Sequence, residues 1–107
     1  YRGTFTYMAP EIKEGKAYNG LQVDTFSIGV ILFILVQGIF PFKEARVEEM
    51  FYSLLKAEKF SEYWDKVGGK SLSNEFKDLM QKMFSYDPSK RPTLDELKNH
   101  AWLTEGN

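Results

Sequence analysis

The chain has 107 residues, 14 of them basic and 15 acidic, and its net charge at pH 7 is −1. This is the length of one small domain, and the balanced charge gives no strong electric field, so we expect no nucleic-acid partner. The sequence has no cysteine and a single histidine, which excludes disulfide scaffolds, thiolate catalysis and zinc fingers, and we expect no metal site.

The aromatic content predicts a folded chain. With 9 Phe, 6 Tyr and 2 Trp, the sequence has the bulky apolar side chains that disordered segments lack. The chain starts at Tyr1 without an initiator Met, a charged leader or an early apolar stretch, so it shows no secretory signal. Together with the lack of cysteine, this start leads us to expect a cytoplasmic or nuclear location.

The most apolar segment is Phe26–Val36, which is preceded by Asp24 and followed by Gly38 and Pro41. These flanks predict an α-helix over residues 23–37. The run is shorter than the ~20 apolar residues of a transmembrane helix, so we expect no membrane span. Because this helix has no polar face, we expect the rest of the fold to bury it on all sides.

A second helix is predicted over about residues 44–57. Its apolar residues fall at helical spacing and form one stripe: Val47, Met50, Phe51, Leu54 and Leu55. The segment that follows includes Gly68-Gly69-Lys70-Ser71, which faintly resembles the end of a phosphate-binding loop. It lacks the earlier glycine and the preceding strand of such a loop, so we expect a flexible connector.

Two further helices are predicted near the C-terminus. The first has Ser73 as N-cap and Asp87-Pro88 as its stop, and it carries a repeating apolar stripe of Phe76, Leu79, Met80, Met83 and Phe84. The second begins at Thr93, which can form a capping box with Glu96. We expect Leu94 and Leu97 of this helix to face inward. No strand-like alternation of useful length is present, so the sequence predicts an all-α fold.

Few side chains could carry out chemistry unaided. His100 is the only imidazole, and we expect it to be packed or at the surface rather than catalytic. Asp87 and Asp95 stand at a turn and at a helix start, where carboxylates commonly cap main-chain amides. Glu11 and Arg91 could form a bidentate ion pair that joins the two ends of the chain, although their spacing alone gives this pairing little support.

Five blocks of sequence, taken in order, resemble the C-terminal half of the large lobe of a eukaryotic protein kinase. The blocks are Gly3-Thr4-Phe5-Thr6-Tyr7-Met8-Ala9-Pro10-Glu11, Asp24-Thr25-Phe26-Ser27-Ile28-Gly29-Val30-Ile31-Leu32, Gly38-Ile39-Phe40-Pro41-Phe42, Asp87-Pro88-Ser89-Lys90-Arg91-Pro92-Thr93 and His100-Ala101-Trp102-Leu103. The resemblance implies that residues 1–107 run from the end of the activation segment to the last helix of the domain. It further implies a partial lobe of helices packed around a central hydrophobic helix.

The resemblance assigns substrate-binding roles to three residues near the N-terminus. Thr4 matches a residue that bonds the catalytic-loop Asp and Lys, neither of which is in this chain, and a Thr here implies specificity for Ser and Thr. Phe5 and Met8 match the floor and wall of the pocket for the substrate residue after the phosphoacceptor. Such an apolar pocket would favour an apolar or uncharged side chain, because burying an unpaired charge is costly.

Three other residues are given structural roles. Glu11 and Arg91 match the buried ion pair of the family. Asp24 matches an aspartate whose carboxylate accepts hydrogen bonds from the catalytic-loop backbone, although a plain helix cap would explain its position equally well. Phe26 stands where a Trp is common, which changes the local packing without implying an inactive protein.

The chain contains nothing that resembles the Gly-rich loop, the ATP-binding Lys, the H-R-D motif with its Asn, or D-F-G. Because these parts hold ATP, Mg²⁺ and the catalytic base, we expect this chain to have no catalytic, cofactor-binding or metal-binding residue and to be inactive alone.

The full-length protein would be a Ser/Thr kinase similar to the calcium/calmodulin-dependent or AMP-activated groups. It would transfer the γ-phosphoryl group of Mg-ATP to proteins, and this part would dock the protein or peptide substrate and pack against the rest of the kinase domain. The alternatives are a non-catalytic helical interaction module and a pseudokinase fragment.

Overall fold

The computed structural model describes residues 7–46, 48–68 and 72–104, and these contain helices and no strand, which confirms the all-α prediction. Helix α2 (Pro10–Lys13) precedes the long helix α3 (Gly20–Gln37). The chain continues through α4 (Met50–Lys56), α5 (Phe60–Val67) and α6 (Asn74–Met83). A 3₁₀ turn η1 (Pro88–Lys90) then leads to α7 (Leu94–Asn99) and α8 (Ala101–Thr104).

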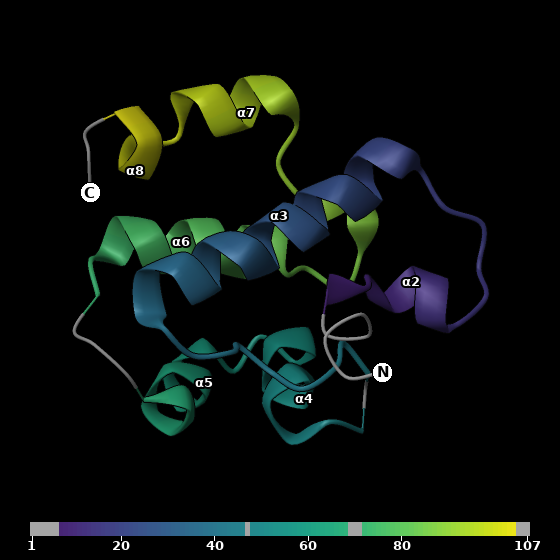
Figure 1. Ribbon diagram of the computed structural model, residues 1–107, viewed down its shortest axis with the longest axis horizontal. Coiled ribbons are helices and arrows are strands. Elements are labelled where there is room, and N and C mark those ends of the chain that lie inside the picture. Colours follow the sequence, from purple (N-terminus) through teal and green to yellow (C-terminus); the bar gives the residue numbers. More distant parts are fainter. Residues whose placement is uncertain (1–6, 47, 69–71, 105–107) are drawn as a thin grey trace.

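Helix α3 runs through the middle of the molecule, with α4 and α5 below it and α7 and α8 above it in the view of Figure 1. It begins three residues before the predicted start, because the side chain of Asn19 accepts a hydrogen bond from the Gln22 amide and caps the helix. It ends at Gln37, and the next residue, Gly38, has a φ of 76°, the left-handed conformation that glycine adopts readily. The predicted central helix is therefore present and longer than expected.

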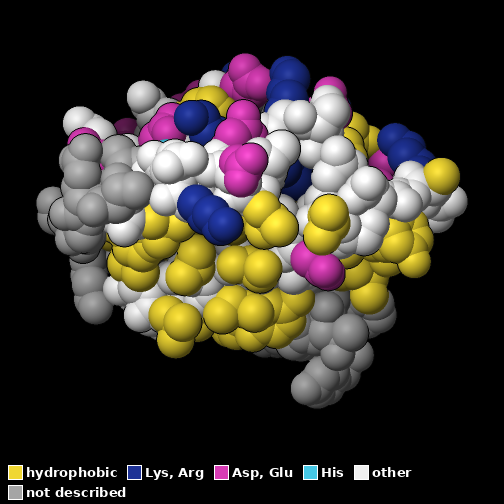
Figure 2. Space-filling model, turned by 90° about the horizontal axis from the view of Figure 1, so that it is seen from above, with side chains coloured by type: hydrophobic (Ala, Val, Ile, Leu, Met, Phe, Trp, Pro, Cys, Tyr) yellow, Lys and Arg dark blue, Asp and Glu magenta, His cyan; other side chains and the backbone are white. Residues whose placement is uncertain are grey.

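The expectation that α3 is buried on all sides is wrong. Phe26, Val30 and Phe33 are fully buried, but Ile28 is 46% exposed and Leu35 is 74% exposed on another face. The described helices leave this second face of α3 uncovered. We call it the bare α3 face, and it consists of Leu21, Asp24, Ile28, Ile31 and Leu35. Figure 2 shows hydrophobic side chains gathered in one broad area of the molecular surface.

Helix α6 packs against α3 in the core. All five residues of its predicted stripe are buried, and the Ser73 side chain caps the helix by accepting from the Phe76 amide, so both predictions are confirmed. Where α3 and α6 meet, a Cβ atom on Gly29 would lie 2.9 Å from the Cβ of Met83. The absence of a side chain at Gly29 therefore allows this close approach. The helix ends at Met83, before the predicted stop at Asp87.

The predicted helix over residues 44–57 is correct only in its second half. Helix α4 begins at Met50, because the Glu49 side chain accepts from the Tyr52 amide and caps it there. Of the predicted stripe, Leu55 is buried and Phe51 and Leu54 pack partly buried against the core, whereas Met50 is 62% exposed. Tyr52, which is not in the stripe, is also buried. Val47 lies outside the described residues.

Two features of the C-terminal half differ from expectation. Helix α5 was not predicted, and it buries Tyr63, whose hydroxyl donates to the Pro41 carbonyl at 2.9 Å. Helix α7 has the predicted capping box between Thr93 and Glu96. Its Leu94 is nevertheless 62% exposed instead of facing inward, since the side of α7 that packs on the core carries Leu97.

By length and composition, α3 is apolar enough to cross a membrane, with a mean hydropathy of 1.7 over 18 residues. The core helix of a soluble protein meets the same criterion. The contacts of α3 are those of a core helix, because the rings of Phe26 and Phe33 lie 5.7 and 6.1 Å from the ring of Phe84.

Candidate functional site

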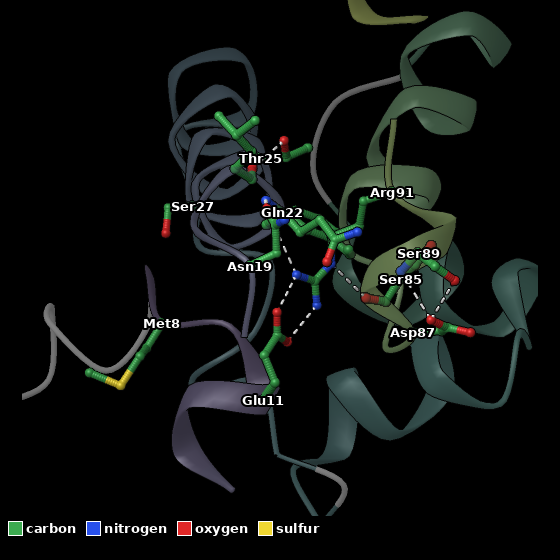
Figure 3. Close-up of polar contacts among 12 residues, drawn as sticks. Met8, Glu11, Asn19, Gln22, Thr25, Ser27, Ser85, Asp87, Ser89 and Arg91 are labelled. Carbon is green, nitrogen blue, oxygen red and sulfur yellow. Dashed lines mark hydrogen bonds and ion pairs between the residues drawn. The ribbon is translucent and has the colours of Figure 1, made fainter. Parts of the chain in front are cut away.

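The side chains of Glu11 and Arg91 form a bidentate ion pair across 80 positions of sequence. Arg91 Nη1 lies 2.7 Å from Glu11 Oε2, and Arg91 Nη2 lies 2.8 Å from Glu11 Oε1. The Arg91 and Glu11 side chains are 0% and 5% exposed. Figure 3 shows Glu11 extending from α2 to meet the guanidinium. The structure thus brings together the two residues that the kinase resemblance pairs.

Further contacts of Arg91 join three parts of the fold. Its Nη1 also donates to the Gln22 carbonyl of α3 at 3.0 Å, and its Nε donates to the Ser85 carbonyl after α6 at 3.0 Å. The guanidinium carbon lies 5.0 Å from the centre of the Phe26 ring, the position where the kinase pattern commonly has Trp. A planar guanidinium with several fixed donors suits such a junction better than the single ammonium of lysine. Arg91 therefore locks α2, α3 and the segment after α6 together.

Of the three residues predicted to bind the substrate, Met8 lies in the described part of the chain, just before α2. Met8 is partly buried, and its carbonyl accepts a hydrogen bond of 2.8 Å from the Lys13 ammonium. The carbonyl of the preceding Tyr7 accepts a hydrogen bond of 2.7 Å from the Ser27 hydroxyl of α3. Thr4 and Phe5, the other two predicted substrate-binding residues, lie outside the described residues.

A cavity of about 560 Å³ lies beside Met8. It is lined by Met8, Ile12, Lys13, Glu14, Glu44, Ala45, Arg46 and Glu48. Burial lowers the pKa of Lys13 to about 8; Glu44 opposes this shift and Arg46 adds to it. Arg46 pairs with Glu48 at 3.2 Å and lies 3.9 Å from Glu44. The cavity therefore combines apolar wall groups with a partly buried amine.

Asp24 does not cap α3. The helix begins at Gly20 and Asn19 caps it, so the plain-cap interpretation of Asp24 is wrong. The Asp24 side chain is exposed on the bare α3 face, between Leu21 and Ile28. An acidic group framed by exposed apolar side chains is suited to accept hydrogen bonds from a segment that covers this face.

The remaining candidate residues have structural contacts. His100 Nε2 lies 2.8 Å from Asp78 Oδ2, and its Nδ1 accepts a hydrogen bond from the Trp102 amide. Asp87 accepts from the Ser89 amide at the start of η1, and Asp95 lies in the first turn of α7. No signal in the sequence identifies Asp78 as the partner of His100. Among the residues that the structure describes, no three His, Asp or Glu side chains lie together as metal ligands would.

A comparison with protein families matches residues 1–103 to the protein kinase domain. A probable serine/threonine-protein kinase, CCRP1 of Zea mays, is 44% identical over 98% of this chain and 16% of that protein. CBL-interacting protein kinase 26 of Oryza sativa subsp. japonica is 39% identical over 98% of this chain and 20% of that protein. Calcium/calmodulin-dependent protein kinase type IV of Mus musculus is 41% identical over 95% of this chain and 21% of that protein. The chain thus spans about a fifth or less of each of these relatives.

Proposed function

Because this chain belongs to the protein kinase domain family, we propose that residues 1–107 are the C-terminal part of the catalytic domain of a Ser/Thr protein kinase. The full-length protein would transfer the γ-phosphoryl group of ATP, bound with Mg²⁺, to Ser or Thr hydroxyls of protein substrates. The observation that carries this proposal is the similarity to Ser/Thr kinases along nearly the whole chain.

Within that kinase, this part would dock the substrate. We assign Thr4, Phe5 and Met8 to the binding of the peptide around the phosphoacceptor, following the kinase resemblance. Two side chains from different helices hold the main chain of Tyr7 and Met8, which supports a defined pocket wall at this position. A wall of this kind would select substrates by the size and polarity of the residue that enters the pocket.

The second role would be to support the rest of the lobe. The bare α3 face is an apolar stripe that a soluble protein needs to cover, and we propose that the remainder of the kinase domain covers it. Asp24 would accept main-chain hydrogen bonds from the catalytic loop there, and its exposure on that face supports this role. Glu11 and Arg91 would hold the docking side and the C-terminal helices in one rigid unit.

ATP and Mg²⁺ would be bound by the remainder of the domain, because no motif for either occurs in this chain. We therefore expect the isolated chain to transfer no phosphate to Ser- or Thr-containing peptides and to show no magnesium-dependent nucleotide binding. A radiolabelled-ATP assay on the chain and on the full-length protein tests both points. Transfer by the full-length protein alone supports the proposal, whereas micromolar ATP binding by the isolated chain contradicts it.

The bare α3 face also favours a second candidate, a helical interaction module that uses this face to bind a partner protein and performs no catalysis. The coding sequence upstream of Tyr1 separates the two candidates. An in-frame H-R-D-x-K-x-x-N motif followed by D-F-G supports the kinase, and a start codon directly upstream supports the module. Substitution of either catalytic Asp in those motifs would instead indicate a pseudokinase.

A further inference from the structure

We propose that Lys13 is a positioning residue for the peptide-binding pocket: its side chain fixes the main chain of Met8, and this fixed wall increases the affinity for the peptide. The inference rests on the proposed function, since the role of Met8 in substrate binding belongs to that proposal. It adds a residue that the kinase-like sequence blocks do not include, because Lys13 follows the Ala9-Pro10-Glu11 block by two positions.

The position of the Met8 carbonyl explains why a side chain is needed there. Main-chain hydrogen bonding of α2 begins at Ala9, whose carbonyl accepts from the amides of Ile12 and Lys13. The Met8 carbonyl precedes this network and receives the Lys13 ammonium instead, at 2.8 Å. Lys13 folds back over the single turn of α2 to make this contact. A hydrogen bond from a charged donor is stronger than one between neutral groups, so this contact restrains the pocket wall.

A second contact holds the residue next to Met8 from another helix. The Tyr7 carbonyl is held by the Ser27 hydroxyl of α3, so two consecutive carbonyls are fixed from two different helices. Met8 and Ser27 lie on one side of the Glu11–Arg91 pair in Figure 3. The wall is thereby tied to the same rigid unit that the ion pair holds together. Loss of Lys13 would release the Met8 end of the wall and leave the Tyr7 end in place.

The charged groups around Lys13 give the contact a pH dependence. Glu44 and Arg46 face the ammonium from the segment after α3, and Glu14 and Glu48 also line the cavity. Burial is the largest influence and lowers the pKa of Lys13 to about 8. Above that pH the amine is neutral and donates a weaker hydrogen bond. An arginine at this position would stay charged throughout, because a guanidinium is not deprotonated in proteins.

The test is the peptide KM of the full-length kinase as a function of pH, for the wild type, Lys13→Met, Lys13→Arg and the control Lys66→Met. Lys66 is exposed on α5, which lies away from α2 (Figure 1). We expect Lys13→Met to raise the peptide KM about threefold to tenfold, the effect of one lost hydrogen bond, with the KM for ATP unchanged. The wild-type KM should rise as the pH passes about 8, relative to a flat profile for Lys13→Arg. Lys66→Met should match the wild type.

The outcomes separate this inference from the proposed function. An active kinase in which Lys13→Met and Lys13→Arg both keep the wild-type KM at every pH overturns the role of Lys13 and leaves the kinase assignment intact. A full-length protein that phosphorylates no peptide overturns the proposed function and this inference with it. Thermal unfolding of each variant shows whether it is folded. If Lys13→Met fails to fold, the pH profiles of the wild type and Lys13→Arg still test the inference, because both side chains can donate to the Met8 carbonyl.

Discussion

At the scale of single residues, Arg91 has the largest structural consequence. It uses both terminal nitrogens and Nε to contact Glu11, Gln22 and Ser85, and its side chain is 0% exposed. Removing one member of a buried pair leaves the other as an uncompensated charge. Loss of the pair would therefore weaken the packing of α2, α3 and the segment after α6 at once.

We predict that Arg91→Ala lowers the free energy of unfolding of the full-length kinase by about 3–5 kcal/mol, because it strands the Glu11 carboxylate in the interior. The matched control is Lys90→Ala. Lys90 is exposed and lies 3.8 Å from Glu58, a surface contact that contributes at most about 1 kcal/mol. Thermal and urea unfolding of both variants measure the difference. Equal melting temperatures would argue against a stabilising role for the buried pair.

A second residue-scale prediction concerns Asp78, which contacts His100 at 2.8 Å and Lys82 at 3.0 Å. Partial burial raises the pKa of this carboxyl, but hydrogen bonds from His100 and Lys82 outweigh that influence and leave the pKa below its ordinary value of 3.8. The folded state therefore favours the charged form. The stabilisation is present above pH 3.8 and is lost as the pH falls through the lower, folded-state pKa.

We accordingly expect Asp78→Asn to be less stable than the wild type near neutral pH and to approach it as the solution is acidified. Melting temperatures measured from pH 6 down to the acid limit of folding provide the check. The exposed carboxylate of Glu62 on α5 offers a control in Glu62→Gln, which should leave the pH dependence unchanged. A difference between Asp78→Asn and the wild type that stays constant with pH would show that the contact has no electrostatic component.

The site residues also show what the sequence can reveal. Spacing alone gives little reason to join Glu11 to Arg91, and their pairing is implied only by the resemblance to the kinase family. The Lys13 contact with Met8 joins residues five apart across a single helical turn, and no motif marks it. The partnership of Asp78 with His100 is likewise invisible, because it depends on how α6 and the segment after α7 meet in space.

At the scale of elements, periodicity was reliable where one helix face meets the core. Helix α6 shows this, since all five residues of its apolar stripe are buried and Ser73 caps it. The unpredicted helix α5 has the same signal, since Phe60, Tyr63, Trp64 and Val67 recur at helical spacing. For α4 the pattern was extended too far, because Glu49 caps the helix and excludes the preceding turn.

The contact between α3 and α6 gives an element-scale prediction. Gly29→Ala would place a Cβ atom 2.9 Å from the Cβ of Met83 and 3.2 Å from the Phe84 ring. Because neither neighbour is the flexible end of a side chain, the two helices would have to move apart. We expect a destabilisation of about 1–3 kcal/mol, in spite of the better helix propensity of alanine.

Gly20→Ala is the matched control for this variant. Gly20 is also in α3, and a Cβ atom there would meet nothing within 4 Å. Chemical unfolding of the two variants should show a loss of stability only for Gly29→Ala. If alanine at position 29 is neutral or stabilising, then the close approach of α3 and α6 does not contribute to the packing.

At the scale of the whole molecule, the main exposed apolar surface is the bare α3 face. The sequence of α3 has no polar face, which led to the expectation of burial on all sides. The described helices leave one face of α3 uncovered, and Leu35 is 74% exposed there. Large exposed apolar patches mark surfaces that contact another protein or segment, so this mismatch is what the proposed cover by the rest of the kinase domain would explain.

The last prediction concerns this surface. We expect the isolated chain to self-associate and to bind a hydrophobic dye, because the bare α3 face exposes Ile28, Ile31 and Leu35 to water. The double variant Ile31→Glu with Leu35→Glu should be monomeric and keep its helical circular-dichroism signal, since both side chains are at the surface. The control Val30→Glu places a charge at a fully buried position and should unfold the chain.

The same double variant in the full-length protein tests what covers the face. If the remainder of the kinase domain packs on it, two buried carboxylates would abolish both soluble expression and phosphoryl transfer. If the face instead binds a separate partner, the double variant would retain any catalytic activity and lose only that association. A wild-type chain that remains monomeric and binds no dye would contradict the premise that this surface requires a cover.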